Sequence, residues 1–198
     1  MSEAPRIMAS DKIELEIFSG LFTLSTLLKK GGNKVKSIAI VGFMGAGKTT
    51  IGKELSSRLN TSFIDVDAFI EKKTKKTIEQ IFQESGEIGF REIETEVLKQ
   101  LPLKNAVIST GGGIVIKEEN RKILNNFYVI WLDVEFEVIL KRLKNDHTRP
   151  LWKQPIEKRL TLYNERRKLY QSVAHLHLKI ADESIDEVIE KIINQLYL

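Results

Sequence analysis

Short apolar runs alternate along this chain with longer segments of helical periodicity. The apolar runs predict buried strands that begin near residues 37, 62, 106, 127 and 175. Segments in which apolar residues recur at helical spacing predict helices over residues 51–59, 72–101, 118–124 and 185–196. Because strands that alternate with helices form parallel sheets covered on both faces, we expect an α/β fold with three layers, α/β/α, around a five-stranded parallel sheet.

The polar segment over residues 72–101 predicts a helix in two pieces. Thr77 is a suitable N-cap for a helix over residues 78–84, Gly86 breaks that helix, and the helical period resumes over residues 87–98. Arg91 and Glu94 are three residues apart and therefore share a face of the second piece. An ion pair on the protein surface is the ordinary interpretation of such spacing.

Residues 1–35 differ from the rest of the chain, and we expect them to form an N-terminal extension with a short helix and a linker. The glycine and lysine cluster over residues 29–34 is typical of a linker. Acidic residues such as Glu3 and Asp11 lie where a signal peptide would carry positive charge, and a transit peptide would be poor in acids. Residues 36–198 are then expected to form one domain.

The amino-acid composition limits the kinds of ligand and partner that the protein is expected to bind. The 31 basic and 27 acidic residues leave a net charge of +4, which is too mild to imply nucleic acid but suits an anionic substrate. Lysines scattered over solvated helix faces would give the same total. The absence of cysteine excludes disulfides, thiolate catalysis and cysteine-ligated zinc. No apolar span is long enough for a membrane helix, and we expect a cytoplasmic protein that binds small molecules.

A phosphate-binding loop comes directly after the first predicted strand. Gly42, Gly47, Lys48 and Thr49 match the pattern Gly, four residues, Gly-Lys-Ser/Thr, and a predicted helix begins after them. In this motif backbone N–H groups surround phosphate oxygens, the lysine reaches the β- and γ-phosphates, and the hydroxyl ligates Mg²⁺. A glycine-rich turn with a chance lysine is the alternative, and the flanking strand and helix argue against it. The expected ATP-binding residues of the loop are Gly45, Ala46, Gly47, Lys48, Thr49 and Thr50.

Two further stretches lie at predicted strand ends. Asp65 and Asp67 are two apart, so in a strand they would share one face at the carboxyl edge, where ligands bind in open α/β sheets. Helix capping is the alternative explanation for such a pair. Gly111, Gly112 and Gly113 come after a buried strand, and three glycines in sequence indicate that something approaches the backbone closely, unless they form a flexible hairpin.

Together these motifs resemble the shikimate kinases. The match includes the phosphate loop, residues 63–67, Gly-Phe-Arg at 89–91 with Glu94, Ser-Thr-Gly-Gly-Gly at 109–113, Arg-Pro-Leu at 149–151 and Arg166 with Leu-Tyr at 169–170. It extends from about residue 37 to the C-terminus. The resemblance implies a P-loop kinase fold with a mobile lid over residues 144–154, and transfer of the ATP γ-phosphoryl group to the 3-hydroxyl of shikimate in aromatic amino-acid biosynthesis.

The resemblance also implies roles for particular residues. The expected shikimate-binding set, with two arginines on the carboxylate and an aspartate on ring hydroxyls, is Asp67, Arg91, Gly112 and Arg166. Asp65 is expected near Mg²⁺ with Thr49, and Arg142 is expected to stack on adenine. Arg149, in the lid, is expected to act on the transferring phosphate and to bind ATP. The catalytic residues would be Lys48, Asp67 and Arg149, with Asp67 accepting the hydroxyl proton or orienting the hydroxyl oxygen. We expect the protein to be a monomer.

One motif departs from the family pattern. The family commonly has Arg-x-Pro-Leu-Tyr, whereas this chain has Arg-Arg-Lys-Leu-Tyr at residues 166–170. Lysine in place of proline removes a backbone constraint and leaves Arg167 as a competing candidate for the carboxylate. Trp152 and His147 in the lid are interpreted as packing or exposed residues. No metal role is expected for His147, His175 or His177, since His175 and His177 alternate on the predicted fifth strand and lack a third ligand nearby.

Other functions remain as alternatives. A kinase of another small hydroxylated metabolite, such as gluconate, could share the loop and lid. A regulatory ATPase could use Asp133 at the end of the fourth predicted strand for Mg²⁺, since the family's strand order would place the first strand between the third and fourth. A GTPase would need an Asn-Lys-x-Asp motif, which the sequence lacks. The intact Lys48, Thr49 and Asp67 argue against a non-catalytic binding module.

Overall fold

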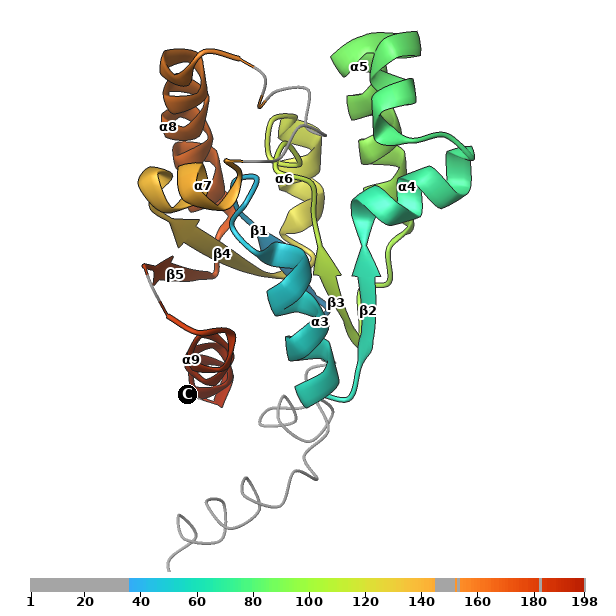
Figure 1. Ribbon diagram of the computed structural model, residues 1–198. Helices are drawn as coiled ribbons and strands as arrows, with labels where there is room; N and C mark the ends of the chain where they lie inside the picture. Colours follow the sequence, from blue (N-terminus) through green and yellow to red (C-terminus); the bar gives the residue numbers. More distant parts are fainter. Residues whose placement is uncertain (1–35, 145–151, 153, 182, 198) are drawn as a thin grey trace, which may run out of the picture.

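A twisted parallel sheet lies at the centre of the protein (Figure 1). The computed structural model describes residues 36–144, 152, 154–181 and 183–197. The strands are β1 (Ile38–Val41), β2 (Ser62–Asp65), β3 (Ala106–Ser109), β4 (Tyr128–Val134) and β5 (Leu176–Ile180). They are all parallel and lie in the order β2-β3-β1-β4-β5. The five predicted strands are therefore confirmed, and the first does lie between the third and fourth.

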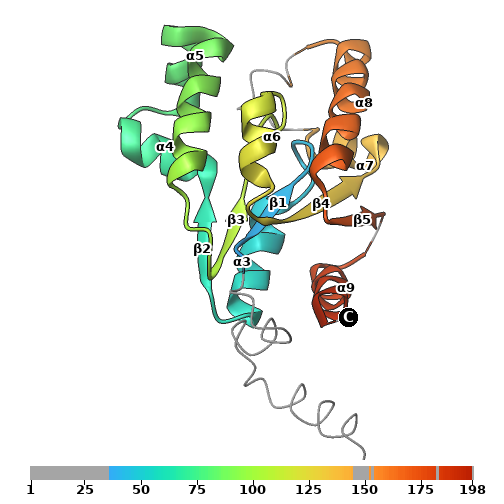
Figure 2. The same cartoon turned by 180° about the vertical axis from the view of Figure 1, so that it is seen from behind.

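Helices cover both faces of this sheet. They are α3 (Lys48–Arg58), α4 (Val66–Thr74), α5 (Ile78–Gln100), α6 (Glu118–Leu124), α7 (Phe136–Arg142), α8 (Ile156–Val173) and α9 (Ile185–Tyr197). Helices α3 and α9 lie on one face and α6 and α8 on the other, while α4 and α5 stand beyond the carboxyl end of β2 (Figures 1 and 2). The three-layer arrangement expected from the sequence is confirmed.

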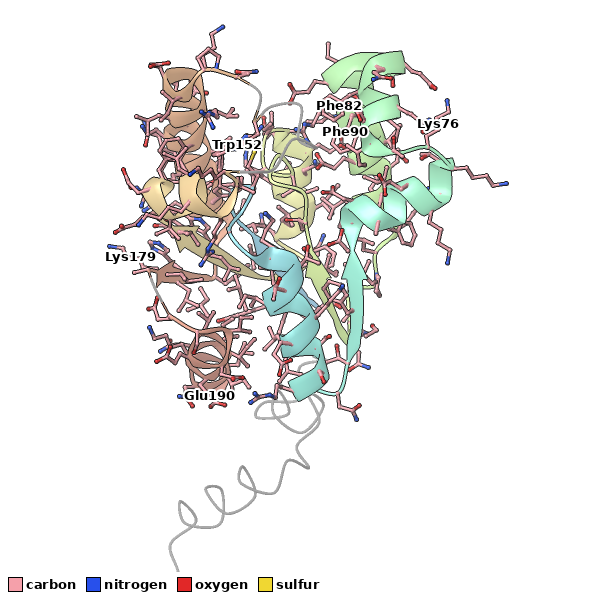
Figure 3. All side chains as sticks on the ribbon, viewed as in Figure 1. Lys76, Phe82, Phe90, Trp152, Lys179 and Glu190 are labelled. Atoms are coloured by element: carbon pink, nitrogen blue, oxygen red, sulfur yellow. The ribbon has the colours of Figure 1, made fainter. Side chains whose placement is uncertain are left out.

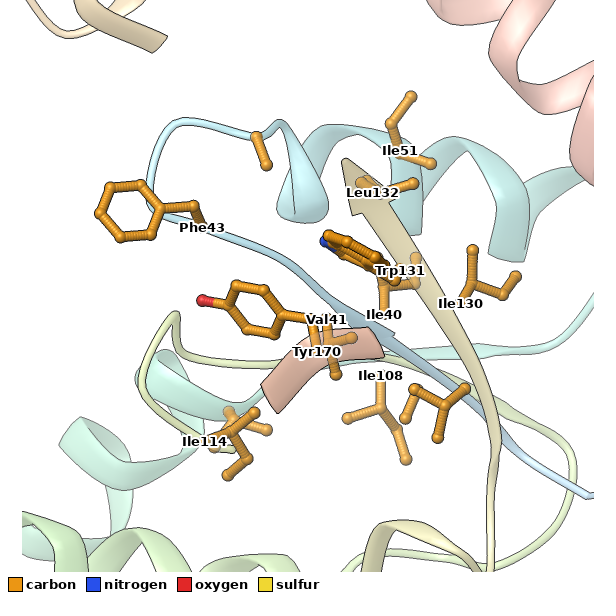
Figure 4. Close-up of a cluster of buried hydrophobic side chains, with 14 of the residues drawn as sticks. Ile40, Val41, Phe43, Ile51, Ile108, Ile114, Ile130, Trp131, Leu132 and Tyr170 are labelled. Carbon is orange, nitrogen blue, oxygen red and sulfur yellow. The ribbon is translucent and has the colours of Figure 1, made fainter. Parts of the chain in front are cut away.

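The core forms where the central strands meet these helices. Every residue of β1 and β3 is buried, as expected for strands with a helix layer on each face. Figure 4 shows side chains of β1, β3 and β4 packed with Tyr170 of α8 and Ile114 of the loop after β3. The core therefore reaches the glycine loop at the carboxyl edge of the sheet.

The predicted break in the long polar segment is present. Thr77 caps α5 through a capping box in which its side chain and that of Gln80 each bond the other residue's backbone N–H. Gly86 has φ +68° inside α5 and kinks the helix there. Because only glycine adopts that conformation without strain, the sequence was sufficient to locate the kink.

The second strand is two residues shorter than predicted, so the strand face assigned to Asp67 is wrong. Strand β2 ends at Asp65, and α4 begins at Val66, so Asp67 lies in the first turn of a helix and not on a strand face. Asp65 Oδ1 accepts hydrogen bonds from the backbone N–H groups of Asp67 (3.1 Å) and Ala68 (3.2 Å), which makes it the N-cap of α4. Capping of this kind stops the strand two residues earlier than the apolar alternation suggests.

Helices α7 and α8 were not predicted. The buried residues of α8 are Tyr163, Arg166, Tyr170 and Val173, so an arginine occupies one of the few inward positions and hides the helical period.

Trp152 is buried, donates from Nε1 to Leu143 O (3.1 Å) and stacks under the guanidinium of Arg159, as expected for a packing residue. No helix in the described part of the chain has the length and apolarity needed to cross a membrane.

Several expectations fall on other parts of the chain. The N-terminal extension over residues 1–35 lies outside the described residues. The same is true of His147 and of Arg149 with the Pro-Leu after it. The lid prediction and the role expected for Arg149 therefore stay predictions.

Candidate active site

The phosphate loop connects β1 with α3. Gly45 and Gly47 have φ values of +78° and +88°, which side chains disfavour, and Gly47 is the N-cap residue of α3. The free N–H groups of the first helical turn therefore begin directly after the loop. A helix N-terminus preceded by such a loop attracts phosphate through its dipole and its unbonded donors.

Lys48 is held across the loop. Its Nζ donates to the carbonyl oxygens of Gly42 and Phe43, each at 2.9 Å, and the residue is buried. These bonds fix a positive charge beside the backbone donors before any phosphate arrives. Such preorganisation matters because it removes the cost of arranging the charge during reaction.

Three oxygen-bearing side chains meet beside the loop. Thr49 Oγ1 lies 2.8 Å from Asp65 Oδ2 and 3.3 Å from Ser109 Oγ. Mg²⁺ binds oxygen ligands and usually needs only one or two from the protein, the others being water and phosphate. The hydroxyl and carboxylate present therefore fit the ion expected from the sequence, and the capping of α4 uses the other oxygen of Asp65.

The loop opens on two cavities. One has a volume of about 220 Å³ and brings together the loop, the β2 end and the β3 end: its lining includes Lys48, Thr49, Asp65, Asp67, Ser109, Thr110 and Gly112. The other, of about 270 Å³, is lined by Ala46, Ile51, Arg142 and residues of β5 and α9. They share Gly45, Gly47 and Thr50, so the two cavities continue into one another across the loop.

Arg142 belongs to the second cavity. It is exposed near the end of α7, and its Nη1 donates to Gly45 O at 3.4 Å. The apolar side chains of Ile51, Ile180 and Val188 also line this cavity. A cation next to an apolar slot suits a flat heteroaromatic ring, on which a guanidinium can stack.

A third cavity, of about 380 Å³, lies between α4, α5, α8 and the glycine loop. It contains all four residues expected to bind the substrate, Asp67, Arg91, Gly112 and Arg166. Asp67 and Gly112 also line the 220 Å³ cavity, so these two residues lie where the cavities join. The three cavities therefore form a row in which the phosphate loop occupies the middle.

Arg91 and Glu94 form a buried pair and not the surface pair that their spacing suggested. Arg91 Nη1 donates to Glu94 Oε2 at 2.8 Å, and Arg91 Nη2 donates to Glu87 Oε1 at 3.0 Å. Burial opposes the charge of Arg91, but Glu94 and Glu87 outweigh it and raise the pKa of Arg91. The correction has a simple cause: the two residues face the glycine loop, which covers them.

The glycine loop is close to these side chains. A β-carbon on Gly113 would lie 2.2–2.5 Å from the guanidinium atoms of Arg91, and one on Gly111 would lie 2.9 Å from Glu94 Oε1 and 3.0 Å from Asp67 Oδ1. None of the three glycines has a positive φ. The close approach predicted from the sequence is therefore present, and the groups that approach include the protein's own site residues.

Arg166 and Arg167, the two arginines in the stretch that differs from the family motif, point in different directions. Arg166 is 3% exposed, lines the 380 Å³ cavity and donates from Nη1 to Gly112 O at 3.2 Å. Arg167 donates to Asp133 Oδ2 at 2.7 Å on the other side of α8. Consequently Arg166, and not Arg167, is available to a ligand in that cavity.

The part of the 380 Å³ cavity next to Arg166 favours an anion. Burial lowers the pKa of Arg166, and the nearby charge of Arg91 lowers it further. Among the described residues, Arg166 Nε has no hydrogen-bond partner. A carboxylate would satisfy this buried donor and reduce the repulsion between two guanidinium groups.

Asp133 does not reach the phosphate loop. Its Oδ2 accepts from Arg167 and lies 2.9 Å from His177 Nε2 of the edge strand β5. It lines none of the three cavities described above. The regulatory-ATPase alternative, which needed Asp133 as a magnesium ligand, therefore loses its structural basis.

Some residues of the site were not identified from the sequence. Met44, Phe82 and Phe90 give the 380 Å³ cavity an apolar wall, and the rings of Phe82 and Phe90 lie 4.8 Å apart on the inner side of α5 (Figure 3). Phe90 lies in the Gly-Phe-Arg stretch at residues 89–91, so its position beside Arg91 is a signal that could have identified it. Phe82 lies one helix piece earlier, across the Gly86 kink, and no local pattern marks it.

Comparisons with known proteins identify relatives over most of the chain. The family model described as shikimate kinase matches residues 44–197. The chain is 44% identical to a Bacillus cereus shikimate kinase over 159 residues, which are 80% of this chain and 96% of that protein. It is 46% identical to the Dictyoglomus turgidum shikimate kinase over 166 residues, which cover 81% of this chain and 96% of that protein.

Solved structures of shikimate kinases superpose on this structure. A shikimate kinase from Acinetobacter baumannii in complex with shikimate superposes with a TM-score of 0.79 at 37% identity, over 82% of this chain and 93% of that one. The Aquifex aeolicus shikimate kinase superposes with a TM-score of 0.72 at 41% identity, over 81% and 95% of the two chains. A Janibacter sugar kinase at 16% identity shares the fold alone.

Proposed function

The chain belongs to the shikimate kinase family and catalyses the ATP-dependent phosphorylation of shikimate in aromatic amino-acid biosynthesis, and from this premise we propose how its residues divide the reaction. The phosphate loop and Arg142 bind ATP, and the cavity between α5 and α8 binds shikimate. The support is the row of cavities, which joins the two binding regions at Asp67 and Gly112.

The reaction forms a bond between the 3-hydroxyl oxygen of shikimate and the γ-phosphorus of ATP. The bond from that phosphorus to the bridging oxygen breaks, ADP leaves, and the hydroxyl proton passes to Asp67. Asp67 suits this role because it lines both the substrate cavity and the phosphate cavity. Lys48 and the backbone amides of the loop stabilise the charge that develops on the phosphate oxygens.

Thr49 and Asp65 are the residues that would hold Mg²⁺. Their 2.8 Å contact gathers a hydroxyl and a carboxylate at the mouth of the phosphate cavity. When bound, the ion would neutralise charge on the β- and γ-phosphates. Asp65 thereby has two tasks, since its other carboxylate oxygen caps α4 and so sets the position of Asp67.

Arg91 and Arg166 hold the shikimate carboxylate. Both are buried, and they come from helices on opposite sides of the glycine loop. Charge-assisted bonds from two guanidinium groups fix the orientation of a small ring and therefore the position of one hydroxyl. Met44, Phe82 and Phe90 supply an apolar wall for the ring carbons.

The remaining expectations are also part of the proposal. Arg149 would act on the transferring phosphate from a lid over residues 144–154, and Arg142 would stack on adenine. A monomer is also retained as a prediction. Residues 36–198 would form the catalytic domain, in keeping with the family match over residues 44–197. Residues 1–35 would be an extension, and a cytoplasmic location is retained as a prediction.

The observation that carries the proposal is the pairing of two buried arginines with Asp67 next to a phosphate loop. The test is ADP release with Mg²⁺ and ATP against shikimate, gluconate and a nucleoside monophosphate. We expect stimulation by shikimate, and NMR coupling between phosphorus and the proton on carbon 3 of the product. Stimulation by gluconate or by the nucleotide, with none by shikimate, would overturn it.

A further inference from the structure

The three carbonyl groups of the glycine loop are held in different ways. Gly111 O accepts from Ile114 N (3.2 Å), and Gly113 O accepts from Ile116 N (3.0 Å), so both are fixed by the turn after the loop. Gly112 O accepts from two side chains of α8, Arg166 Nη1 and the hydroxyl of Tyr170. In the described part of the chain, no other group donates a hydrogen bond to Gly112 O.

The peptide after Gly112 therefore depends on α8 for its orientation. A peptide unit is planar, so fixing the carbonyl also fixes the N–H of the next residue. Glycine has the widest range of backbone conformations, and three in sequence cannot hold a peptide plane by themselves. Gly112 lies where the substrate and phosphate cavities meet, which makes its orientation important for both.

We propose that Tyr170 is a positioning residue for shikimate binding, because its hydroxyl holds the Gly112 carbonyl while Arg166 turns to the substrate carboxylate. The inference rests on the proposed function and extends it. Arg166 Nη1 lies 3.2 Å from Gly112 O, which is long for a charged donor, and the Tyr170 hydroxyl donates to the same oxygen. A carboxylate would draw Arg166 away and leave Tyr170 as the remaining donor to that oxygen.

The surroundings of Tyr170 suit a fixed anchor. The side chain is 1% exposed, and Figure 4 shows its ring among Val41, Trp131 and Ile114 with the hydroxyl at the end away from Trp131. Burial raises the pKa of Tyr170, so the hydroxyl keeps its proton and remains a donor. The helix is uninterrupted from Ile156 to Val173, so Arg166 and Tyr170, four apart, reach the same oxygen from one face.

The chain contains a matched control on the same helix. Tyr163 is also buried, and its hydroxyl also donates to a backbone carbonyl, Val134 O, at 3.1 Å. That carbonyl belongs to the end of β4 and not to the glycine loop. Tyr163→Phe therefore removes an equivalent hydroxyl without touching Gly112.

The experiment compares Tyr170→Phe with Tyr163→Phe in steady-state assays and in calorimetric titrations of shikimate without nucleotide. For Tyr170→Phe we expect the KM and Kd for shikimate to rise roughly five- to tenfold, as for a lost neutral hydrogen bond. The kcat and the KM for ATP should stay within about twofold, and Tyr163→Phe should change none of the four. Replacing Tyr170 with 4-aminophenylalanine, which keeps a donor at the same place, should restore most of the affinity.

Equal effects of the two phenylalanine variants would overturn the proposal, since they would indicate a loss of packing only. A fall in kcat together with equal rises in both KM values would do the same. If Tyr170→Phe does not fold, the 4-aminophenylalanine variant decides: near-normal shikimate affinity supports the anchor and a weakened one opposes it. Failure of the proposed function itself would be distinct, because the unaltered protein would then not turn over shikimate.

Discussion

Thr49 Oγ1 and Asp65 Oδ2 lie 2.8 Å apart, and this contact ties the first turn of α3 to the carboxyl end of β2. Asp65 also caps α4 through its second oxygen, so a single carboxylate connects the phosphate loop, the position proposed for Mg²⁺ and the helix that carries Asp67. The arrangement explains why one strand end can serve both the nucleotide and the acceptor.

The first prediction rests on that contact. Asp65→Asn should raise the Mg²⁺ concentration for half-maximal rate by about tenfold or more, because a charged oxygen beside the ion is lost. Asparagine is itself a good N-cap, so α4 should remain in place. Asp133→Asn is the control: it should lower the melting temperature by weakening the contact with Arg167, and leave the Mg²⁺ requirement unchanged. A metal defect in Asp133→Asn alone would contradict the assignment.

Arg166 and Arg167 should differ sharply in their effects. Arg166→Ala should raise the KM for shikimate roughly 10- to 150-fold, the equivalent of about 1.5–3 kcal/mol for a charge-assisted bond, with little change in the KM for ATP. Arg167→Ala should mainly lower stability, because its partner is Asp133 outside the cavities. Initial rates over both substrates, with thermal melts, distinguish the two. The reverse pattern would show that Arg167, and not Arg166, binds the carboxylate.

Lys48 should matter for the chemical step more than for shikimate binding. Lys48→Met should reduce kcat about 10²- to 10³-fold, because a charge fixed beside the phosphate loop is removed. Shikimate affinity without nucleotide, measured by calorimetry, should change little. Lys53→Met, an exposed substitution on the same helix, provides the control. A kcat within tenfold of normal for Lys48→Met would argue against the proposed role.

Gly113→Ala tests the close approach in the glycine loop. The added β-carbon would collide with the guanidinium of Arg91, whose flexible side chain can yield while the backbone cannot. We expect a folded protein with normal ATP binding and a KM for shikimate raised about tenfold, as for displacement of one charged contact. Equilibrium binding of both ligands to the variant measures this. Loss of ATP affinity with unchanged shikimate affinity would show that the collision is relieved elsewhere.

One pH effect on stability can be predicted. Hydrogen bonds from Lys191 and from the backbone N–H of Ala181 lower the pKa of Glu183 from 4.5 to about 2. A depressed carboxyl pKa stabilises the fold above pH 4.5, and this stabilisation is lost as the pH falls toward 2. Because the site is largely solvated, the effect should be below about 1 kcal/mol. Urea unfolding of Glu183→Gln and the unaltered protein should differ at pH 7 and converge near pH 2; an unchanged difference would contradict it.

Local chemistry in the sequence determined much of this protein. The apolar runs located the five strands, and the phosphate-loop motif located the nucleotide site, because both depend on residues adjacent in the chain. Thr77 and Gly86 located a helix start and a kink for the same reason. The motif order supported the family, and the comparisons confirmed it.

Only the tertiary structure decided questions that depend on contacts between distant segments. The spacing of Arg91 and Glu94 suggested a surface pair, whereas the glycine loop covers both residues. Asp133 was the metal ligand of an alternative function, and its contacts with Arg167 and His177 argue against that alternative. Adjacent residues in α8 point in different directions, so the choice of Arg166 required the helix to be placed against Gly112. Sequence spacing gives the face a residue shares with its neighbours, whereas burial and partners depend on which element packs there.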